Sequence, residues 1–344
     1  MMRFPSGPML IVALALAALP AAAQEKKTLV ISMWGYNGDK LEAHLFKPFR
    51  ERNNVDIVLE PGNSADRLNK VKIRRGGVDL IYLPDSFSQI GIQDGLFEPI
   101  DRARIPNIET LYAAAQAPNG KAYGPGYTIG RYGVIYDSAK VTAPVTAWGD
   151  LWRPEFKQRL SLPGFSTTAG PLTVLVAAAR RKVDPFTDTD AAFASLAELK
   201  PNLLKTYNTG SELVNLFSTG EIVVAAAQDF TFGQIKAAVP TARWAELSDG
   251  AFANFNTVNV VKGTKDKELA QRFIDWHLSA EVQKALAIAG TDAPASTKAE
   301  LTPEQAAPWT YGEAMIGALH TPDYAKVNAA KADWSDRWNE VFGR

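Results

Sequence analysis

The chain has 344 residues, contains no cysteine, and balances 37 basic against 37 acidic residues. The absence of cysteine excludes disulfides, thiolate nucleophiles and cysteine-based metal sites. Because there is no basic excess to hold phosphates, we expect no nucleic-acid partner. The length suggests about two domains as a starting expectation.

The first 23 residues have the pattern of a cleaved secretory signal. Arg3 supplies a positive charge, and the apolar run at 9–19 is too short to span a bilayer comfortably. Ala21 and Ala23 follow in the small-x-small arrangement of a cleavage site. We therefore predict a signal peptide at 1–23 and a periplasmic location, with an N-terminal membrane anchor as the alternative. Cleavage removes Arg3 and leaves 36 basic against 37 acidic residues, a net charge of −1.

The first part of the remaining chain alternates between strand and helix patterns. Strands are predicted at 28–33, 55–60 and 78–83, with helices at 39–52 and 64–76 between them. Pro48 should kink or split the first helix, because proline lacks an N–H. This alternation predicts a parallel sheet covered by helices. Ligands in such sheets bind beyond the carboxyl ends of the strands, where "SMWGYN" at 32–37 and "PDSFS" at 84–88 fall.

The rest of the chain also has α/β character. We predict helices at 169–181, 188–200, 211–220 and 267–290, and strands at 221–227 and 255–261. A long amphipathic helix is predicted at 324–342, where Trp334, Trp338 and Phe342 recur at four-residue spacing. That aromatic stripe is typical of a helix packed onto the body of the protein.

No catalytic or metal-binding motif stands out. The three histidines, His44, His277 and His320, lack metal-ligand spacing. The "GPGYTIG" segment at 124–130 contains a proline and precedes a strand, unlike a dinucleotide-binding loop. The "GFSTTAG" segment at 164–170 does not have the spacing of a nucleophile elbow. The sequence therefore predicts no enzymatic activity, no metal and no cofactor. A ferric-ion site would need clustered tyrosines, but the tyrosines here are spaced along strand-like sequence and would not converge on one point.

Several longer segments carry a family resemblance. They are strand-"WGYN", "YGPGYTIGRYGVIYD", "WGDLWRPEFKQRLSL" and "NTVNVVKGTKDKELAQRFIDWHLSAEVQ". With these segments the chain resembles a periplasmic solute-binding protein of an ABC importer, nearest to the spermidine/putrescine-binding subgroup. The resemblance implies an α/β, two-lobed periplasmic-binding-protein fold (type II), each lobe a mixed, mostly parallel sheet flanked by helices. Two crossing strands would join lobe one, 27–130 and 253–300, to lobe two, 131–252 and 301–344.

The same resemblance implies what the protein does. It would capture a small organic solute by hinge closure and deliver it to the membrane permease. A polyamine or related amine is favoured, and the protein is expected to be a monomer. Two alternatives stay open: a small anionic or zwitterionic solute bearing a carboxylate or phosphonate, and an exported enzyme on a bilobal frame.

The resemblance also places the ligand site at loops of both lobes. The implied ligand-binding residues are Trp34, Tyr36, Asn37, Asp85, Ser86, Phe87, Phe165, Thr167, Thr168, Gln228, Asp229, Asn256 and Thr291. At Phe165, Thr168 and Asn256 the family's carboxylates are replaced by neutral residues. Stripping water from an ammonium is costly without an opposite charge, so Asp85, Asp229 and Asp292 are the neighbouring acids that could substitute.

Two short segments have competing interpretations. Trp34 and Tyr36 would form an aromatic wall on which an amine gains cation–π attraction, or they pack against loops of their own lobe. The hydroxyls of 166–168 precede a predicted helix. They suit a carboxylate or phosphonate, or they form a plain N-cap.

Overall fold

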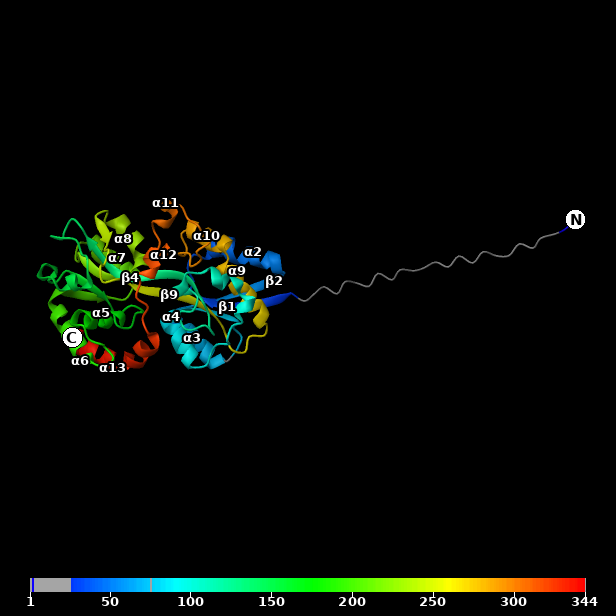
Figure 1. Cartoon of the computed structure of the whole chain (residues 1–344), viewed down its shortest axis with the longest axis horizontal. Coiled ribbons are helices and arrows are strands. Elements are labelled where there is room, and N and C mark those ends of the chain that lie inside the picture. The colour runs from blue at the N-terminus through cyan, green and yellow to red at the C-terminus, as the bar shows by residue number, and fades with distance from the viewer. Residues whose placement is uncertain (1, 3–25, 75, 344) are drawn as a thin grey trace.

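The computed structural model describes Met2, residues 26–74 and residues 76–343. The predicted signal peptide therefore lies outside the described residues, apart from Met2. One mixed sheet runs through the molecule, with helices on both faces (Figure 1). Its strand order is β2-β1-β3-β9-β4-β7-β5-β6, and β8 pairs with β4 beside that path.

The N-terminal strands and helices form the part of the molecule at the end of the sheet that begins with β2. These elements are β1 (Lys27–Met33), α1 (Gly38–Leu41), α2 (Lys47–Asn53), β2 (Val55–Pro61), α3 (Ser64–Arg74), β3 (Leu80–Pro84) and α4 (Asp85–Gln93). The later helices α9 (Lys267–Leu278) and α10 (Ala280–Ile288) return to the same end. The parallel pairing of β1 with both β2 and β3 confirms the parallel strands predicted there.

Pro48 splits the first helix as predicted. A π-helical turn, Glu42–Phe46, separates α1 from α2, and Pro48 lies in the first turn of α2. The helical run continues through the π-helical turn, where the regular hydrogen-bond ladder is interrupted, and this interruption accommodates a residue that lacks an N–H. Leu41, Leu45 and Phe49 remain buried on one face, so the interruption preserves the packing of the helix onto the sheet.

The other end of the sheet carries the middle of the chain. Its elements are β5 (Leu160–Pro163), α5 (Leu172–Arg181), α6 (Thr189–Leu199), β6 (Leu203–Tyr207), α7 (Gly210–Ser218), β7 (Val224–Gln228), α8 (Phe232–Ala238) and β8 (Ala242–Trp244). Here β5 pairs in parallel with both β6 and β7. The carboxyl ends of these strands lead into the loops that follow residues 163, 207 and 228.

Two long strands connect the two ends of the sheet. β4 (Gly126–Asp137) and β9 (Phe252–Val260) pair antiparallel with each other, Arg131 opposite Ala253. β9 also pairs with β3, whereas β4 also pairs with β7. At Gly130 a Cβ would lie 2.8 Å from Oδ1 of Asp229, so a larger residue there would require the Asp229 side chain to move.

The hydrophobic core divides along the same line. Two buried clusters draw on residues up to Ile129 and from Ala253 onward, including Leu29, Phe273 and Ile316. Two others draw on residues 132–245 and on the C-terminal helix α13 (Tyr324–Phe342). In Figure 1 the corresponding elements occupy opposite sides of the molecule, and β4 and β9 run between them. The predicted lobe boundaries themselves stay a prediction.

The C-terminal segments follow β9 and the helices α9 and α10. Two short helices, α11 (Pro303–Ala306) and α12 (Glu313–Gly317), precede α13. Trp334 and Trp338 are buried, which confirms that the aromatic stripe packs onto the body. Ile316 instead packs in the cluster that contains Leu29, so α12 contributes to the core of the other end of the sheet.

Candidate functional site

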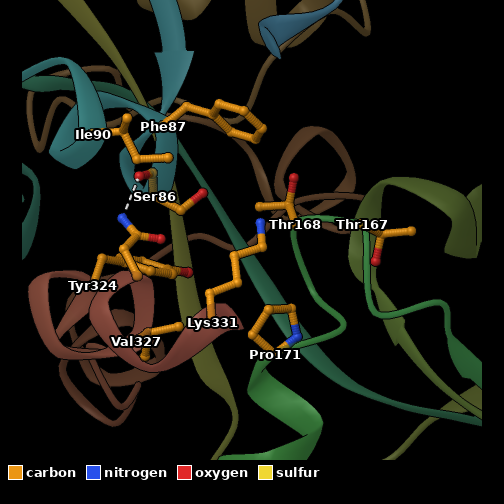
Figure 2. Close-up of a pocket in the computed structure, with 10 residues that line it drawn as sticks. Ser86, Phe87, Ile90, Thr167, Thr168, Pro171, Tyr324, Val327 and Lys331 are labelled. Atoms are coloured by element: carbon orange, nitrogen blue, oxygen red, sulfur yellow. Dashed lines mark hydrogen bonds between the residues drawn. The ribbon is translucent and has the colours of Figure 1, made fainter. Parts of the chain in front are cut away.

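A narrow pocket, open to solvent, lies between the two ends of the sheet (Figure 2). Its walls come from the start of α4, directly after β3, from the loop between β5 and α5, and from α13. The lining residues are Ser86, Phe87, Ile90, Thr167, Thr168, Pro171, Tyr324, Val327, Asn328 and Lys331. The pocket therefore joins a loop at the carboxyl end of β3 with a loop at the carboxyl end of β5, the position at which α/β sheets bind ligands.

A hydrogen bond connects the two sides of this pocket. Nδ2 of Asn328, on α13, donates to the backbone carbonyl of Ser86 at 2.9 Å. The Ser86 hydroxyl and the Tyr324 hydroxyl are buried, and neither has a hydrogen-bond partner. Buried polar atoms are normally paired, so both hydroxyls are available to a bound molecule.

Asp85 lies behind the pocket wall. Its carboxylate accepts hydrogen bonds from the backbone N–H of Ser86 at 2.9 Å and of Phe255 at 3.2 Å. Complete burial raises the pKa of Asp85 to about 7, even though these two hydrogen bonds favour the charged form. Asp85 thus holds the loop after β3 against β9, while Ser86 and Phe87 line the pocket.

The loop between β5 and α5 contributes Thr167 and Thr168 to the pocket. The Thr167 hydroxyl donates to the carbonyl of Gly164 at 2.8 Å and accepts from the N–H of Gly170 at 3.1 Å, so it closes the loop. The N-cap of α5 is Pro171, without a side-chain hydrogen bond. The plain N-cap interpretation of 166–168 is therefore wrong, because the helix begins later than its sequence pattern suggests.

Trp34, Tyr36 and Asn37 follow β1, the strand beside β3. Trp34 packs partly against the core, and the guanidinium of Arg67 lies 4.8 Å from its ring centre. Tyr36 is exposed, and its hydroxyl donates to Oδ1 of Asp292 at 3.2 Å. Asn37 adopts a left-handed conformation at the start of α1. These three residues are at the carboxyl edge of the sheet but do not line the pocket of Figure 2.

Asp292 is a carboxylate without a cationic partner among the described residues. Burial raises its pKa to about 6, and the hydrogen bond from Tyr36 opposes that rise. The neighbouring Thr291 is also buried, and its hydroxyl has no hydrogen-bond partner. Tyr36 links this acid to an aromatic pair, because its ring lies 6.3 Å from that of Trp34, and a carboxylate with neighbouring rings suits an ammonium group.

The acid at the carboxyl end of β7 is engaged within the protein. Asp229 accepts a hydrogen bond from the Thr310 hydroxyl. Burial raises its pKa, although the nearby Arg131 favours the charged form. Gln228, the last residue of β7, pairs with Tyr132 of β4. This pair of residues borders the crossing strands and is not part of the pocket of Figure 2.

The remaining predicted ligand residues lie apart from the pocket. Phe165 is buried against Trp338, with 5.5 Å between the ring centres, so its side chain belongs to the core. Asn256 is half-buried on β9, between Pro84 of β3 and Thr128 of β4. Of the thirteen predicted positions, the pocket thus brings together Ser86, Phe87, Thr167 and Thr168.

Three polar pocket residues lay outside the sequence-based prediction. They are Tyr324, Asn328 and Lys331, all on α13. Their spacing of i, i+4 and i+7 places them on one face of the helix. The helix continues into Trp334 and Trp338. Because of these tryptophans, the whole helix was interpreted from its sequence as packing on the core. The polar residues in the first half of the helix were the sequence signal that it also lines a pocket.

Other kinds of site have no support in the described part of the chain. It contains no group of three or more histidine, aspartate or glutamate residues arranged to hold a metal ion. None of the helices in the described residues is both long and apolar enough to cross a membrane. His277 is used internally, with Nδ1 2.8 Å from the Tyr82 hydroxyl.

The fold places a pocket between two α/β halves. Residues 44–313 match the family of bacterial extracellular solute-binding proteins, and the chain belongs to this family. It is the solute-binding component of an ABC transporter. Members of this family serve transport, and the family assignment confirms the predicted extracytoplasmic location.

Relatives of known name span most of the chain. A gamma-aminobutyric acid-binding protein of Pseudomonas aeruginosa PAO1 is 28% identical over 279 residues, 78% of this chain and 76% of the relative. A putrescine-binding periplasmic protein of Pseudomonas aeruginosa UCBPP-PA14 is 24% identical over 283 residues, 76% of each chain. An ABC transporter structure from Clostridium perfringens is 38% identical with a TM-score of 0.86, covering 91% of this chain and 99% of that one. The likeness confirms the predicted two-lobed fold.

Proposed function

We propose that the protein captures a small organic amine between its two lobes and presents it to the permease of its importer. In this proposal lobe one comprises 27–130 and 253–300, and lobe two comprises 131–252 and 301–344, although α12 within the last range packs on the core of lobe one. The two Pseudomonas aeruginosa relatives are named for the compounds they bind, putrescine and gamma-aminobutyric acid. Both compounds carry a primary amine on a short chain. The protein acts as a monomer and catalyses no reaction.

The observation that carries this proposal is the half-buried carboxylate of Asp292, which has no cationic partner among the described residues and accepts a hydrogen bond from Tyr36. An ammonium group loses its hydration shell when it is buried, and an opposite charge must replace that shell. Asp292 supplies the charge, the Tyr36 hydroxyl orients the carboxylate, and Trp34 offers a ring face. The pocket between α4, α13 and the loop after β5 supports binding between the lobes.

Thermal unfolding with a panel of solutes tests the proposal. The panel contains putrescine, spermidine, 4-aminobutanoate and glucose as an uncharged compound. A bound amine at a thousand times its dissociation constant should stabilise the protein by about 4 kcal/mol. Asp292→Asn should weaken amine binding roughly 10- to 100-fold, because a charge-assisted hydrogen bond is lost. The matched control is Asp39→Asn, which changes an exposed acid near Tyr36.

Three results would contradict the proposal. In the first, no amine shifts the unfolding temperature of the wild-type protein. In the second, glucose stabilises the protein as strongly as the amines. In the third, Asp292→Asn binds amines with the affinity of Asp39→Asn. Conversion of any panel member to a product would contradict the absence of catalysis.

A further inference from the structure

Lys331 provides a positive charge in the wall of the pocket. It lies on α13, and its side chain points toward Thr168 of the loop after β5 (Figure 2). The ammonium group lies 5.9 Å from the ring centre of Phe87, a distance that allows a weak cation–π contact. The lysine thus stands between the two loops that the pocket joins.

This ammonium has no anionic partner among the described residues. The acids on the same helix are engaged or exposed: Asp333 pairs with Arg337 at 3.1 Å, and Asp336 faces solvent. Asp85, behind the pocket wall, is held by backbone N–H groups. Partial burial lowers the pKa of Lys331, and no neighbouring charge raises it. A partly buried, unpaired charge costs free energy that a bound anion would offset.

The pocket also contains hydroxyl groups that can donate hydrogen bonds. Ser86 is 8% exposed and Tyr324 is 5% exposed, and the hydroxyls of both residues lack partners. Thr168 adds a hydroxyl beside the lysine, and Figure 2 shows these side chains around the same space. Each hydroxyl can donate to a negatively charged oxygen. No carboxylate lines the pocket, so the pocket has nothing with which to neutralise an ammonium group.

We propose that Lys331 binds an anionic oxygen group of the solute, a carboxylate or a phosphonate, with the hydroxyls of Ser86, Thr168 and Tyr324 as further donors. This inference rests on the proposed capture of an amine. It narrows the substrate class to amines that also carry an acid group, and it makes Lys331 the residue that discriminates against diamines.

Titration calorimetry with four short-chain compounds tests this specificity. The compounds are 4-aminobutanoate, 3-aminopropylphosphonate, butanoate and putrescine; the first two distinguish a carboxylate from a phosphonate. Lys331→Met keeps an unbranched side chain that is shorter by one atom, and it removes the charge. It should weaken binding of the acid-bearing compounds roughly 10- to 100-fold. Lys326→Met is the matched control on the same helix, because Lys326 is exposed and pairs with Asp323. Lys331→Glu should reverse the preference in favour of putrescine.

The outcomes separate this inference from the proposed function. Binding of either amino acid-like compound to the wild type, weakened in Lys331→Met and unchanged in Lys326→Met, supports the inference. Binding of putrescine alone, or equal affinity of Lys331→Met and wild type for the acid-bearing compounds, overturns the inference and leaves the proposed function standing. If no compound in the panel binds, the proposed function fails and this inference fails with it.

Discussion

Two buried ionisable side chains give the stability of the protein opposite dependences on pH. Burial raises the pKa of Asp85 to about 7 and lowers the pKa of His277 to about 3. Below its raised pKa the native protein binds a proton at Asp85 that the unfolded chain releases more readily. The native protein conversely disfavours protonation of His277. Each residue thus makes a contribution to the free energy of unfolding that a substitution can isolate.

Asp85→Asn should flatten the pH dependence of stability in one interval. Between the ordinary pKa of 3.8 and the native value of about 7, the native state binds more protons at Asp85 than the unfolded state. The free energy of unfolding therefore falls as pH rises through this interval, and Asp85→Asn removes that fall. Chemical denaturation of both proteins at pH 4, 5.5 and 7 measures the difference.

Asp137→Asn is the control of opposite sign. Burial opposes ionisation of Asp137, but hydrogen bonds from Thr241 and Ala139 outweigh it and lower the pKa of this residue. Its contribution to stability is therefore lost as pH falls, so Asp137→Asn should lose less stability in acid than the wild type. Parallel pH profiles for wild type and Asp85→Asn would contradict the assignment of a raised pKa to Asp85.

Trp34→Ala should weaken amine binding while the protein remains folded. One cation–π contact contributes about 0.5–2 kcal/mol, so the affinity should fall roughly 2- to 30-fold. Trp276→Ala is the matched control, because Trp276 also stacks on an arginine, Arg52 at 4.3 Å, but on α9. Calorimetry on both variants measures the effect. Equal affinity of Trp34→Ala and wild type would remove Trp34 from the site.

Part of the site could be predicted from residues alone, because the carboxyl ends of strands locate ligand loops. Ser86 follows a strand that was predicted from its apolar pattern, and Thr168 lies in a loop that the family resemblance identified. Both residues line the pocket. Phe165 stands in an equivalent loop but packs on Trp338, a contact that depends on the position of a helix far away in the chain. Lys331 was missed for the same reason: its role depends on where α13 docks.

At the scale of elements, α13 serves both the core and the pocket. Its C-terminal half buries Trp334 and Trp338, and its N-terminal half presents Tyr324, Asn328 and Lys331 to the pocket. Because the same helix carries both sets, the packing of the tryptophans fixes the position of the pocket wall. A loss of packing should therefore lower stability and affinity together.

Trp334→Ala tests this coupling. Trp334 is fully buried, and its ring stacks on Phe186 with 5.4 Å between ring centres. Truncation of a buried tryptophan costs about 3–5 kcal/mol. Urea denaturation should show that loss, and calorimetry should show weaker solute binding. Asp336→Ala, an exposed change on the same helix, should alter stability by less than about 0.5 kcal/mol. A loss below about 1 kcal/mol in Trp334→Ala would contradict the account.

Long, strongly patterned elements were predictable, and short ones were not. The apolar run before residue 34 and the stripe over 324–342 correspond to β1 and α13 as observed. The strands β6 and β8 were not predicted. β6, "LLKTY", is only partly buried at the edge of the sheet, and β8 has three residues. Edge strands receive their order from the neighbouring strand, so their own sequence carries little signal.

At the scale of the whole molecule, two crossing strands join two separately packed cores. The paired residues Arg131 and Ala253 mark the point on β4 and β9 where the buried clusters change from one group to the other. Motion about a few backbone angles near this point would open or close the space between α4 and the loop after β5. The hydrogen bond from Asn328 to Ser86 crosses that space and would break on opening.

The most direct test of a solute held between the two lobes is a crystal structure with the tightest-binding amine of the panel. We expect density for the solute between the start of α4 and the loop after β5, with any acid group of the solute at Lys331. A solute bound elsewhere on the molecule, with this space filled by protein side chains, would contradict the account.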